Sequence, residues 1–418
     1  MRIVDNLVAR VRRHESLVRI APAVAVTLAF AVAAKRLVPI VRAPLGAAGL
    51  GDVGVDFATI IYGPNLLVAE GLNPWDPINS VPRFGVFPSS PLWPSSYVFG
   101  SLFQRIGFDA LLVTWMLLTV VIVVFGARRI ALSFHVAPRA AWMIGVVMLL
   151  SPAFVYDVDL GQTGAGLVAI TAFFAALHVP PRGRWRLVEQ IGFGAVALLL
   201  VPKPTFALAA ITAELAYRRR LDWCARAAAV IAVVGGACLV VIMRRADLTI
   251  GNVIESVRET STILGDVPLQ RIEGDRVDWL SLIVPSPALD LAMIIVALAV
   301  VLVIWRWRAP TTFERLFLGT IVTTLLTYHH MYDTMHLLIL VLVSMVLWPG
   351  RRAWVVLAAT VVASWLYRIA ALDRFTSRLT DIGSFALQAR LVFVVGGGLA
   401  ADALLRIHRR ISSGSDPP

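Results

Sequence analysis

Long apolar stretches separated by short runs of arginine are the feature that most constrains how this chain folds. A helix needs about 20 apolar residues to cross a bilayer, and roughly ten stretches approach that length. The composition agrees, because 58% of the residues are hydrophobic and only 15% are charged. The predicted spans lie near Leu17–Ala34, Leu111–Gly126, Ala140–Val155, Thr163–Val179, Ala225–Met243, Leu289–Trp305, Phe313–Tyr328, Met335–Leu347, Ala353–Ile369 and Phe385–Leu405.

Two further apolar segments do not read as simple spans. Val86–Phe103 contains Pro88, Pro91 and Pro94, which argues against a straight helix because proline removes a backbone donor and clashes with the preceding turn. Ile191–Tyr217 is interrupted by Pro202-Lys203-Pro204. Such segments either re-enter on one side or span with a kink. The sequence therefore predicts an all-α polytopic membrane protein of about 10–12 transmembrane helices with re-entrant or broken segments.

The distribution of charge predicts the orientation of the chain. The net charge is +12, but the arginines lie in short runs between spans, which is the pattern of cytoplasmic loops and not of a nucleic-acid surface. Both termini are then cytoplasmic, and the outer loops lie near 35–88 and 244–288. We expect a multi-pass protein of the cell membrane, a single domain over residues 1–418, with a disordered tail at 412–418.

The first outer loop carries the most informative acids. Asp52 and Asp56 follow the first predicted span, and Tyr62 lies a short apolar run later. A carboxylate at this boundary can accept a proton from a substrate hydroxyl. The alternative for Asp56 is structural, since aspartate is a favoured N-cap and Asp56 precedes a short helix through Ile61.

A second polar stretch opens the predicted span at Thr163. Either Asp159 or Thr163 can cap that helix. Gln162, at the outer boundary, can instead form a hydrogen bond with a ligand hydroxyl. The sequence leaves both interpretations open.

Lys203 stands alone in an apolar segment of a chain that has only one other lysine, Lys35. An ammonium within a membrane is costly unless it pairs or reaches water. It either snorkels to the interface or contacts a phosphate, for which a compact cation is suited.

Histidines gather at the outer end of a predicted span, in the stretch that holds His329, His330, Tyr332 and His336. Some of these side chains are four residues apart, as metal ligands on one helical face can be. A turn interrupts the helix here and no zinc-protease pattern is present. We therefore expect hydrogen bonds to a sugar or phosphate, or boundary anchoring, and no metal site.

These stretches occur in a recognisable order. They are Asp56-Phe57, Tyr62, Gly71-Leu72-Asn73-Pro74-Trp75-Asp76, Phe87-Pro88-Ser89, Leu160-Gly161-Gln162-Thr163-Gly164, Lys203-Pro204, and either Tyr328-His329-His330 or Tyr332-Asp333-Thr334-Met335-His336. The order resembles the C-type superfamily (GT-C) of membrane glycosyltransferases, and most of all the actinobacterial mannosyl- and arabinofuranosyltransferases that use polyprenyl-phosphate sugars. Trp75 stands where that group usually has tyrosine, and Gly164 where it has asparagine.

The resemblance implies an inverting transferase without a cofactor, which moves mannose or arabinofuranose from a polyprenyl-phosphate donor to a cell-envelope glycan or glycolipid on the outer face. It implies that Asp56 is the catalytic base and that Lys203, His329, His330 or His336 contact the donor phosphate. It implies membrane lipids and no nucleic acid as partners. Substrate contacts are then expected from Asp52, Tyr62, Asp159, Gln162 and Tyr332. A transporter or flippase of a lipid-linked sugar, or an inactive homologue, remains the alternative.

Overall fold

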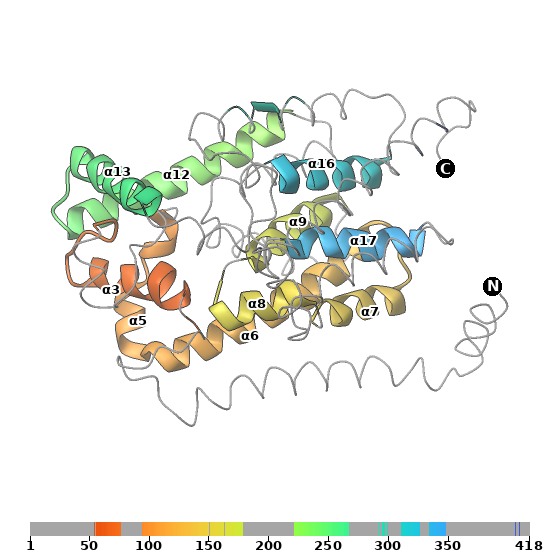
Figure 1. Cartoon of the computed structure of the whole chain (residues 1–418), viewed down its shortest axis with the longest axis horizontal. Coiled ribbons are helices and arrows are strands. Elements are labelled where there is room, and N and C mark those ends of the chain that lie inside the picture. Colours follow the sequence, from red (N-terminus) through yellow and green to blue (C-terminus); the bar gives the residue numbers. More distant parts are fainter. Residues whose placement is uncertain are drawn as a thin grey trace, which may run out of the picture.

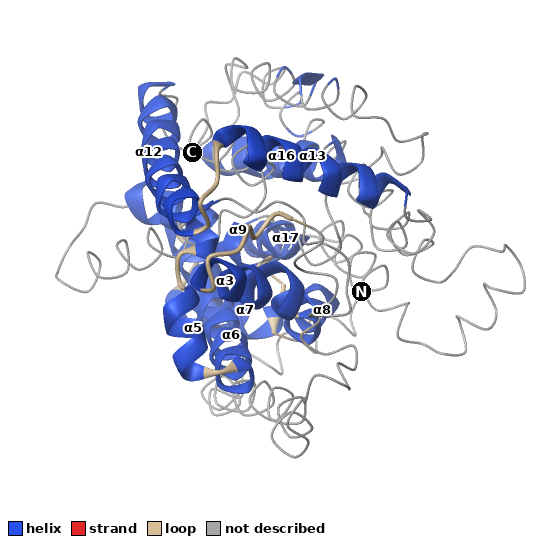
Figure 2. Ribbon diagram, turned by 90° about the vertical axis from the view of Figure 1, so that its left-hand side faces the viewer, coloured by secondary structure: helices blue, strands red, loops and turns tan. Residues whose placement is uncertain are grey.

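The structure is a computed structural model, and it describes part of the chain. The described residues are 54, 56–76, 94–149, 151–162, 164–178, 221–266, 311–326 and 334–347, with single positions at 292, 295, 296, 299, 406 and 409. Within these residues every regular element is helical and no strand occurs (Figure 2). The prediction of an all-α fold is confirmed.

The described elements are all helices. They are the π-helix η1 (Phe57–Tyr62), α3 (Gly63–Ala69), the 3-10 helix η2 (Pro94–Tyr97), α5 (Gly100–Ile106), α6 (Phe108–Ser133), α7 (Pro138–Met148), α8 (Pro152–Leu160), α9 (Ala165–His178), α12 (Leu221–Arg245), α13 (Ile250–Asp266), α16 (Thr312–Leu326) and α17 (Met335–Leu347).

Helix α6 is the centre of the bundle. It packs along α7 and α9, and α17 contacts all three of these helices as well as α16. It has 26 residues and is long and apolar enough to cross a membrane. The predicted span Leu111–Gly126 lies inside it.

The predicted span Ala140–Val155 is interrupted by a bend in the structure. The structure divides it into α7 and α8, which are bent by 53° relative to each other. Pro152 is the cause, because it cannot donate to the preceding turn. Ser151 then caps the new helix, its hydroxyl oxygen accepting a bond from the Phe154 N–H at 3.2 Å. Proline at the first helical position and serine before it are typical of a helix start.

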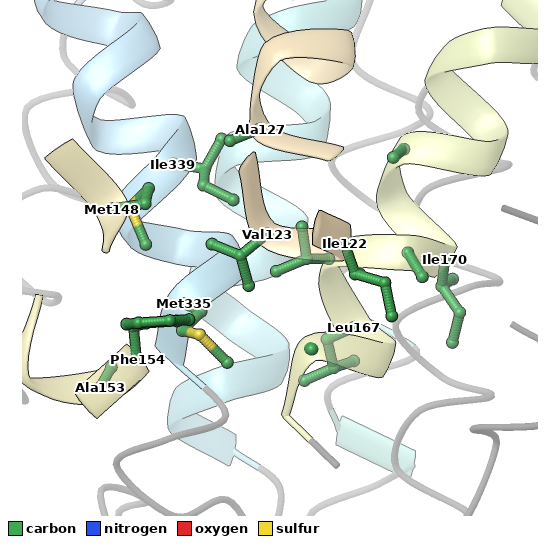
Figure 3. Close-up of a cluster of buried hydrophobic side chains, with 14 of the residues drawn as sticks. Ile122, Val123, Ala127, Met148, Ala153, Phe154, Leu167, Ile170, Met335 and Ile339 are labelled. Atoms are coloured by element: carbon green, nitrogen blue, oxygen red, sulfur yellow. The ribbon is translucent and has the colours of Figure 1, made fainter. Parts of the chain in front are cut away.

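Aliphatic side chains fill the space between these helices (Figure 3). Ile122 and Val123 of α6 meet side chains of α7, α9 and α17 in one buried cluster. Gly145 allows α7 to approach α6 closely, since a Cβ there would lie 2.6 Å from the Val124 carbonyl oxygen. Burial of such side chains contributes about 1.5–3 kcal/mol each in a water-facing reference, and less where the alternative surrounding is lipid.

Helices α3 and α5 pack together at one end of the bundle, the end at which α13 also lies (Figure 1). The buried side chain of Asn65 in α3 joins η1, η2 and the start of α5: its amide donates to the carbonyls of Ile61 and Ser96 at 2.8 and 2.7 Å, and its oxygen accepts from the Phe99 N–H at 2.8 Å. Asn73 donates to the Ser256 hydroxyl of α13 at 2.8 Å. The segment after α3 and helix α13, which are far apart in the sequence, thereby meet.

Helix α13 was not anticipated from the sequence. It lies within the predicted outer loop 244–288, and its apolar residues Ile250, Val253, Ile254 and Val257 recur at helical spacing. Apolar residues at this spacing indicate an amphipathic helix, so the sequence does contain a pattern that predicts α13.

Several predicted segments lie wholly or mostly outside the described residues. They are the spans Leu17–Ala34, Leu289–Trp305, Ala353–Ile369 and Phe385–Leu405, the broken segment Ile191–Tyr217, and the tail 412–418.

Candidate functional site

Asp56 and Gln162, which are 106 residues apart, meet through their side chains. The Gln162 amide Nε2 donates a short hydrogen bond to Asp56 Oδ2. Asp56 stands at the N-cap position of η1 but makes no capping bond with its side chain. Asp56 therefore does not act as an N-cap through its side chain, which was the structural alternative for this residue. Its carboxylate instead faces the link between α8 and α9.

A glycine makes this meeting possible. Gly161 ends α8 in the left-handed conformation, with φ of 70° and ψ of 36°, which glycine adopts without strain. A Cβ on it would lie 2.5 Å from the Cβ of Phe57. The Gly54 N–H also donates to the Asp159 carbonyl at 2.7 Å. The start of η1 and the end of α8 thus touch along their backbones.

Gln162 is held on both sides and is nearly buried, at 5% exposure. Its backbone N–H donates to the Asp157 carbonyl at 2.8 Å, and its carbonyl accepts from the Trp115 indole at 3.0 Å. Its side-chain oxygen Oε1 is buried and, among the described residues, has no hydrogen-bond partner. Among the described residues, the amide nitrogen of Gln162 therefore has a hydrogen-bond partner and the amide oxygen has none.

Asp157 makes a side-chain hydrogen bond at the start of α9, whereas Thr163 lies outside the described residues. Asp157 is fully buried, at 0% exposure, and its Oδ1 accepts from the Gly164 N–H at 2.7 Å, just before α9 begins. The two residues are seven positions apart, on either side of the Gly161 turn, so a local capping pattern in the sequence does not predict this bond. Asp159 is positioned instead by its backbone contact with Gly54 and has a buried Oδ1 atom.

Aromatic rings surround Phe57 next to this pair. The Phe57 ring lies 5.6 Å from that of Trp115 and 5.8 Å from that of Phe108, while Tyr62 stacks on Phe103 at 6.1 Å. Burial, and secondly the negative charge of Asp109, raise the pKa of the Tyr62 phenol. Tyr62 thus stays neutral and keeps its proton to donate.

Of the remaining predicted site residues, the structure describes His336 and not the others. His336 is buried, at 2% exposure, in the first turn of α17, beside Met335 of the shared apolar cluster (Figure 3). Asp52, Lys203, His329, His330 and Tyr332 lie outside the described residues. In the part of the chain that is described, no three His, Cys, Asp or Glu side chains group as metal ligands do.

Comparison with known families decides the class of the protein. The model of Glycosyltransferase family 87 matches residues 94–328, which is more than half of the chain. The chain belongs to glycosyltransferase family 87. This family 87 protein is therefore a glycosyltransferase, and its long apolar helix α6 fits a membrane protein. The match includes Gln162 and Lys203, whereas Asp56 precedes it and His329 follows it.

Neither the curated proteins nor the solved structures contain a match to this family 87 chain.

Proposed function

We propose that this protein is an inverting glycosyltransferase that uses a polyprenyl-phosphate sugar, with mannose or arabinofuranose as the sugar, and needs no metal or cofactor. The acceptor is a cell-envelope glycan or glycolipid. The acceptor oxygen bonds to the anomeric carbon while its proton moves to Asp56. The bond from the anomeric carbon to the phosphate oxygen breaks, and its electron pair leaves with the polyprenyl phosphate.

The observation that carries this proposal is the contact between Asp56 and Gln162. A general base must be ionised and aimed by its neighbours, and a hydrogen bond from an amide to a carboxylate favours the charged form. A carboxylate has about four acceptor positions, and the bond from Gln162 occupies one of them. Gln162 also lies within the residues that the family matches.

The arrangement of charge along α6 supports an active site on the extracytoplasmic side of the cell membrane. The end of α6 near Phe57 is its amino end, where Phe108 lies. Arg128 and Arg129 occupy the other end, where the Arg128 guanidinium lies 4.7 Å over the Trp142 ring. With 26 residues at 1.5 Å each, α6 is about 39 Å long, which exceeds a hydrocarbon core of about 30 Å. Clustered arginines mark the cytoplasmic end.

The leaving phosphate needs positive charge or hydrogen-bond donors as its bond breaks. We assign this role to Lys203, which the family match includes, with His329, His330 and His336 as further donors. Asp52, Tyr62, Asp159 and Tyr332 complete the proposed substrate contacts. Tyr62 is suited to this role because its phenol stays neutral beside Asp109.

The test is transfer of radiolabelled sugar from a polyprenyl-phosphate donor in membranes that carry each variant. Asp56→Asn keeps the shape and can still accept from Gln162, but it removes the base. We expect turnover to fall by about 10²–10⁴-fold while donor binding persists. Asp52→Asn is the comparison variant, since it makes the same change at the rival carboxylate four residues earlier.

Turnover of Asp56→Asn within a few-fold of wild type, together with an inactive Asp52→Asn, would assign the base to Asp52. If wild-type membranes transfer no sugar from any polyprenyl-phosphate donor, the proposed function is wrong, and a flippase or an inactive homologue replaces it.

A further inference from the structure

We propose that Gln162 is a positioning residue with two partners: its amide N–H holds the Asp56 carboxylate, and its Oε1 accepts a hydrogen bond from a second hydroxyl of the acceptor. The acceptor is then a sugar with two adjacent free hydroxyls, of which one is glycosylated and the other is bound. This inference rests on the proposed function and specifies the acceptor of that same site.

The chemistry of the pair fixes which way the Gln162 amide points. An ionised carboxylate only accepts hydrogen bonds, so the NH₂ group of Gln162 must face Asp56, as it does. The amide oxygen is then directed away from that carboxylate oxygen. A neutral amide oxygen only accepts, so its missing partner is an O–H or N–H group.

The surroundings keep Gln162 from turning to another partner. Its backbone is bound at both its N–H and its carbonyl, by Asp157 and by Trp115. Its side chain is 5% exposed, and Oε1 has no partner among the described residues. A buried acceptor left without a bond is destabilising. A site that holds one in this way rejects ligands that lack the matching hydroxyl.

The hydroxyl that reacts cannot fill this position. It has a single proton, and in the proposed reaction that proton goes to Asp56. The bond to Oε1 must therefore come from a different hydroxyl of the same acceptor. Asp56 and Oε1 lie on either side of the Gln162 amide nitrogen, so we place the second hydroxyl on the carbon next to the one that reacts.

Two variants separate the two halves of the Gln162 amide. Gln162→Met removes both the N–H donor and the oxygen acceptor. Gln162→Glu keeps an acceptor oxygen but replaces the NH₂ group with a second oxygen, which places a second carboxyl group beside that of Asp56. Gln104→Met is the matched control, because Gln104 lies exposed on α5. Each variant is first checked for a monodisperse peak in detergent, and Gln162→Glu serves if Gln162→Met does not fold.

The probes are octyl α-mannoside, octyl α-arabinofuranoside and the monodeoxy analogue of each at every free position. With wild-type protein we expect the analogue that lacks the hydroxyl next to the transfer position to lose on the order of ten- to hundredfold in kcat/KM. With Gln162→Met this penalty falls to about threefold or less, because the partner of that hydroxyl is gone. With Gln162→Glu and Gln104→Met the penalty remains.

The pH profile supplies a readout that a merely structural role would not move. Loss of the N–H bond disfavours the charged base, so the acid limb of kcat/KM shifts upward by about one to two pH units in Gln162→Met. It shifts further in Gln162→Glu, where two carboxyl groups share one site. Among the described residues, the other ionisable groups on the elements near the pair are Tyr62 on η1, Asp109 on α6, and Asp157 and Asp159 on α8, and they are unchanged in every variant.

A penalty that persists in Gln162→Met, or an acid limb that does not move, overturns the inference. Transfer to native membrane acceptors but to neither octyl glycoside also overturns it and leaves the proposed function standing. Absence of transfer to any acceptor overturns the proposed function itself.

Discussion

Gly161→Ala is the substitution whose effect follows most directly from the structure. The new Cβ would lie 2.5 Å from the Phe57 Cβ, whereas carbon atoms pack at about 3.5–4.0 Å. Relief of this contact requires η1 and the end of α8 to separate by about 1–1.5 Å. Rotation of the Phe57 side chain about its Cα–Cβ bond cannot relieve the contact, because the contact is with the Cβ atom itself.

The expected loss of stability has two parts. A side chain in the left-handed conformation costs about 1–2 kcal/mol, and overpacking adds about 1–3 kcal/mol. The free energy of unfolding should therefore fall by about 2–5 kcal/mol. Gln162 is the next residue, so the same separation takes its amide out of hydrogen-bond range of Asp56. A misplacement of this size costs about 10²-fold in turnover.

The assay is a titration of the purified protein with a denaturing detergent, followed by sugar transfer at a temperature where the variant is folded. Gly236→Ala is the control, because a Cβ there meets nothing within 4 Å, and alanine stabilises a helix relative to glycine by about 1 kcal/mol. Gly161→Asn tolerates the left-handed backbone better and isolates the steric part. If Gly161→Ala is as stable and as active as wild type, the close contact between η1 and α8 does not exist in solution.

Three further predictions test the donor site, the topology and the ionisation of Tyr62. Lys203→Met should weaken donor binding while the protein remains inserted, and unchanged affinity in a donor-binding assay would make Lys203 a snorkelling residue. In a background without Cys224 and Cys238, an impermeant thiol reagent added outside intact cells should label Glu259→Cys and not Arg139→Cys, both of which replace exposed residues; the reverse pattern would contradict the assigned orientation. Burial and Asp109 raise the pKa of Tyr62 in the folded protein, so the associated stability is full below the unfolded value of about 10 and is lost as the pH rises through the folded pKa. Unfolding titrations from pH 8 to 11 should show a smaller alkaline loss in Tyr62→Phe, and an identical loss would argue against a buried phenol.

Much of the candidate site could be named from the sequence, but its connections could not. Asp56, Tyr62, Asp159 and Gln162 attract attention because acids and amides are conspicuous at the edges of apolar stretches. Nothing local indicates that Gln162 donates to Asp56. The sequence indicated Asp159 or Thr163 as a helix cap and did not indicate Asp157, because capping patterns are local and the contact of Asp157 with Gly164 spans seven residues.

The sequence by itself determined the helical class and its setting. Its apolar stretches are long enough to span a bilayer, and backbone groups in lipid must satisfy one another, which leaves helices as the regular structure for such stretches. It also determined where a helix breaks, in the case of Pro152, although the break was recognised only in the fold. Hydropathy averages over a window and so does not register a single proline.

Tertiary structure alone decided which polar residues meet. The Asp56–Gln162 contact depends on Gly161 adopting φ of 70° against Phe57 and on Trp115 and Asp157 holding the Gln162 backbone. Some of these contacts are between segments that are distant in the chain. The glycine turn is a local feature that many sequences share, so it does not by itself predict the contact. A hydrogen bond depends on the distance and direction between two atoms, and that geometry exists only after the helices have packed.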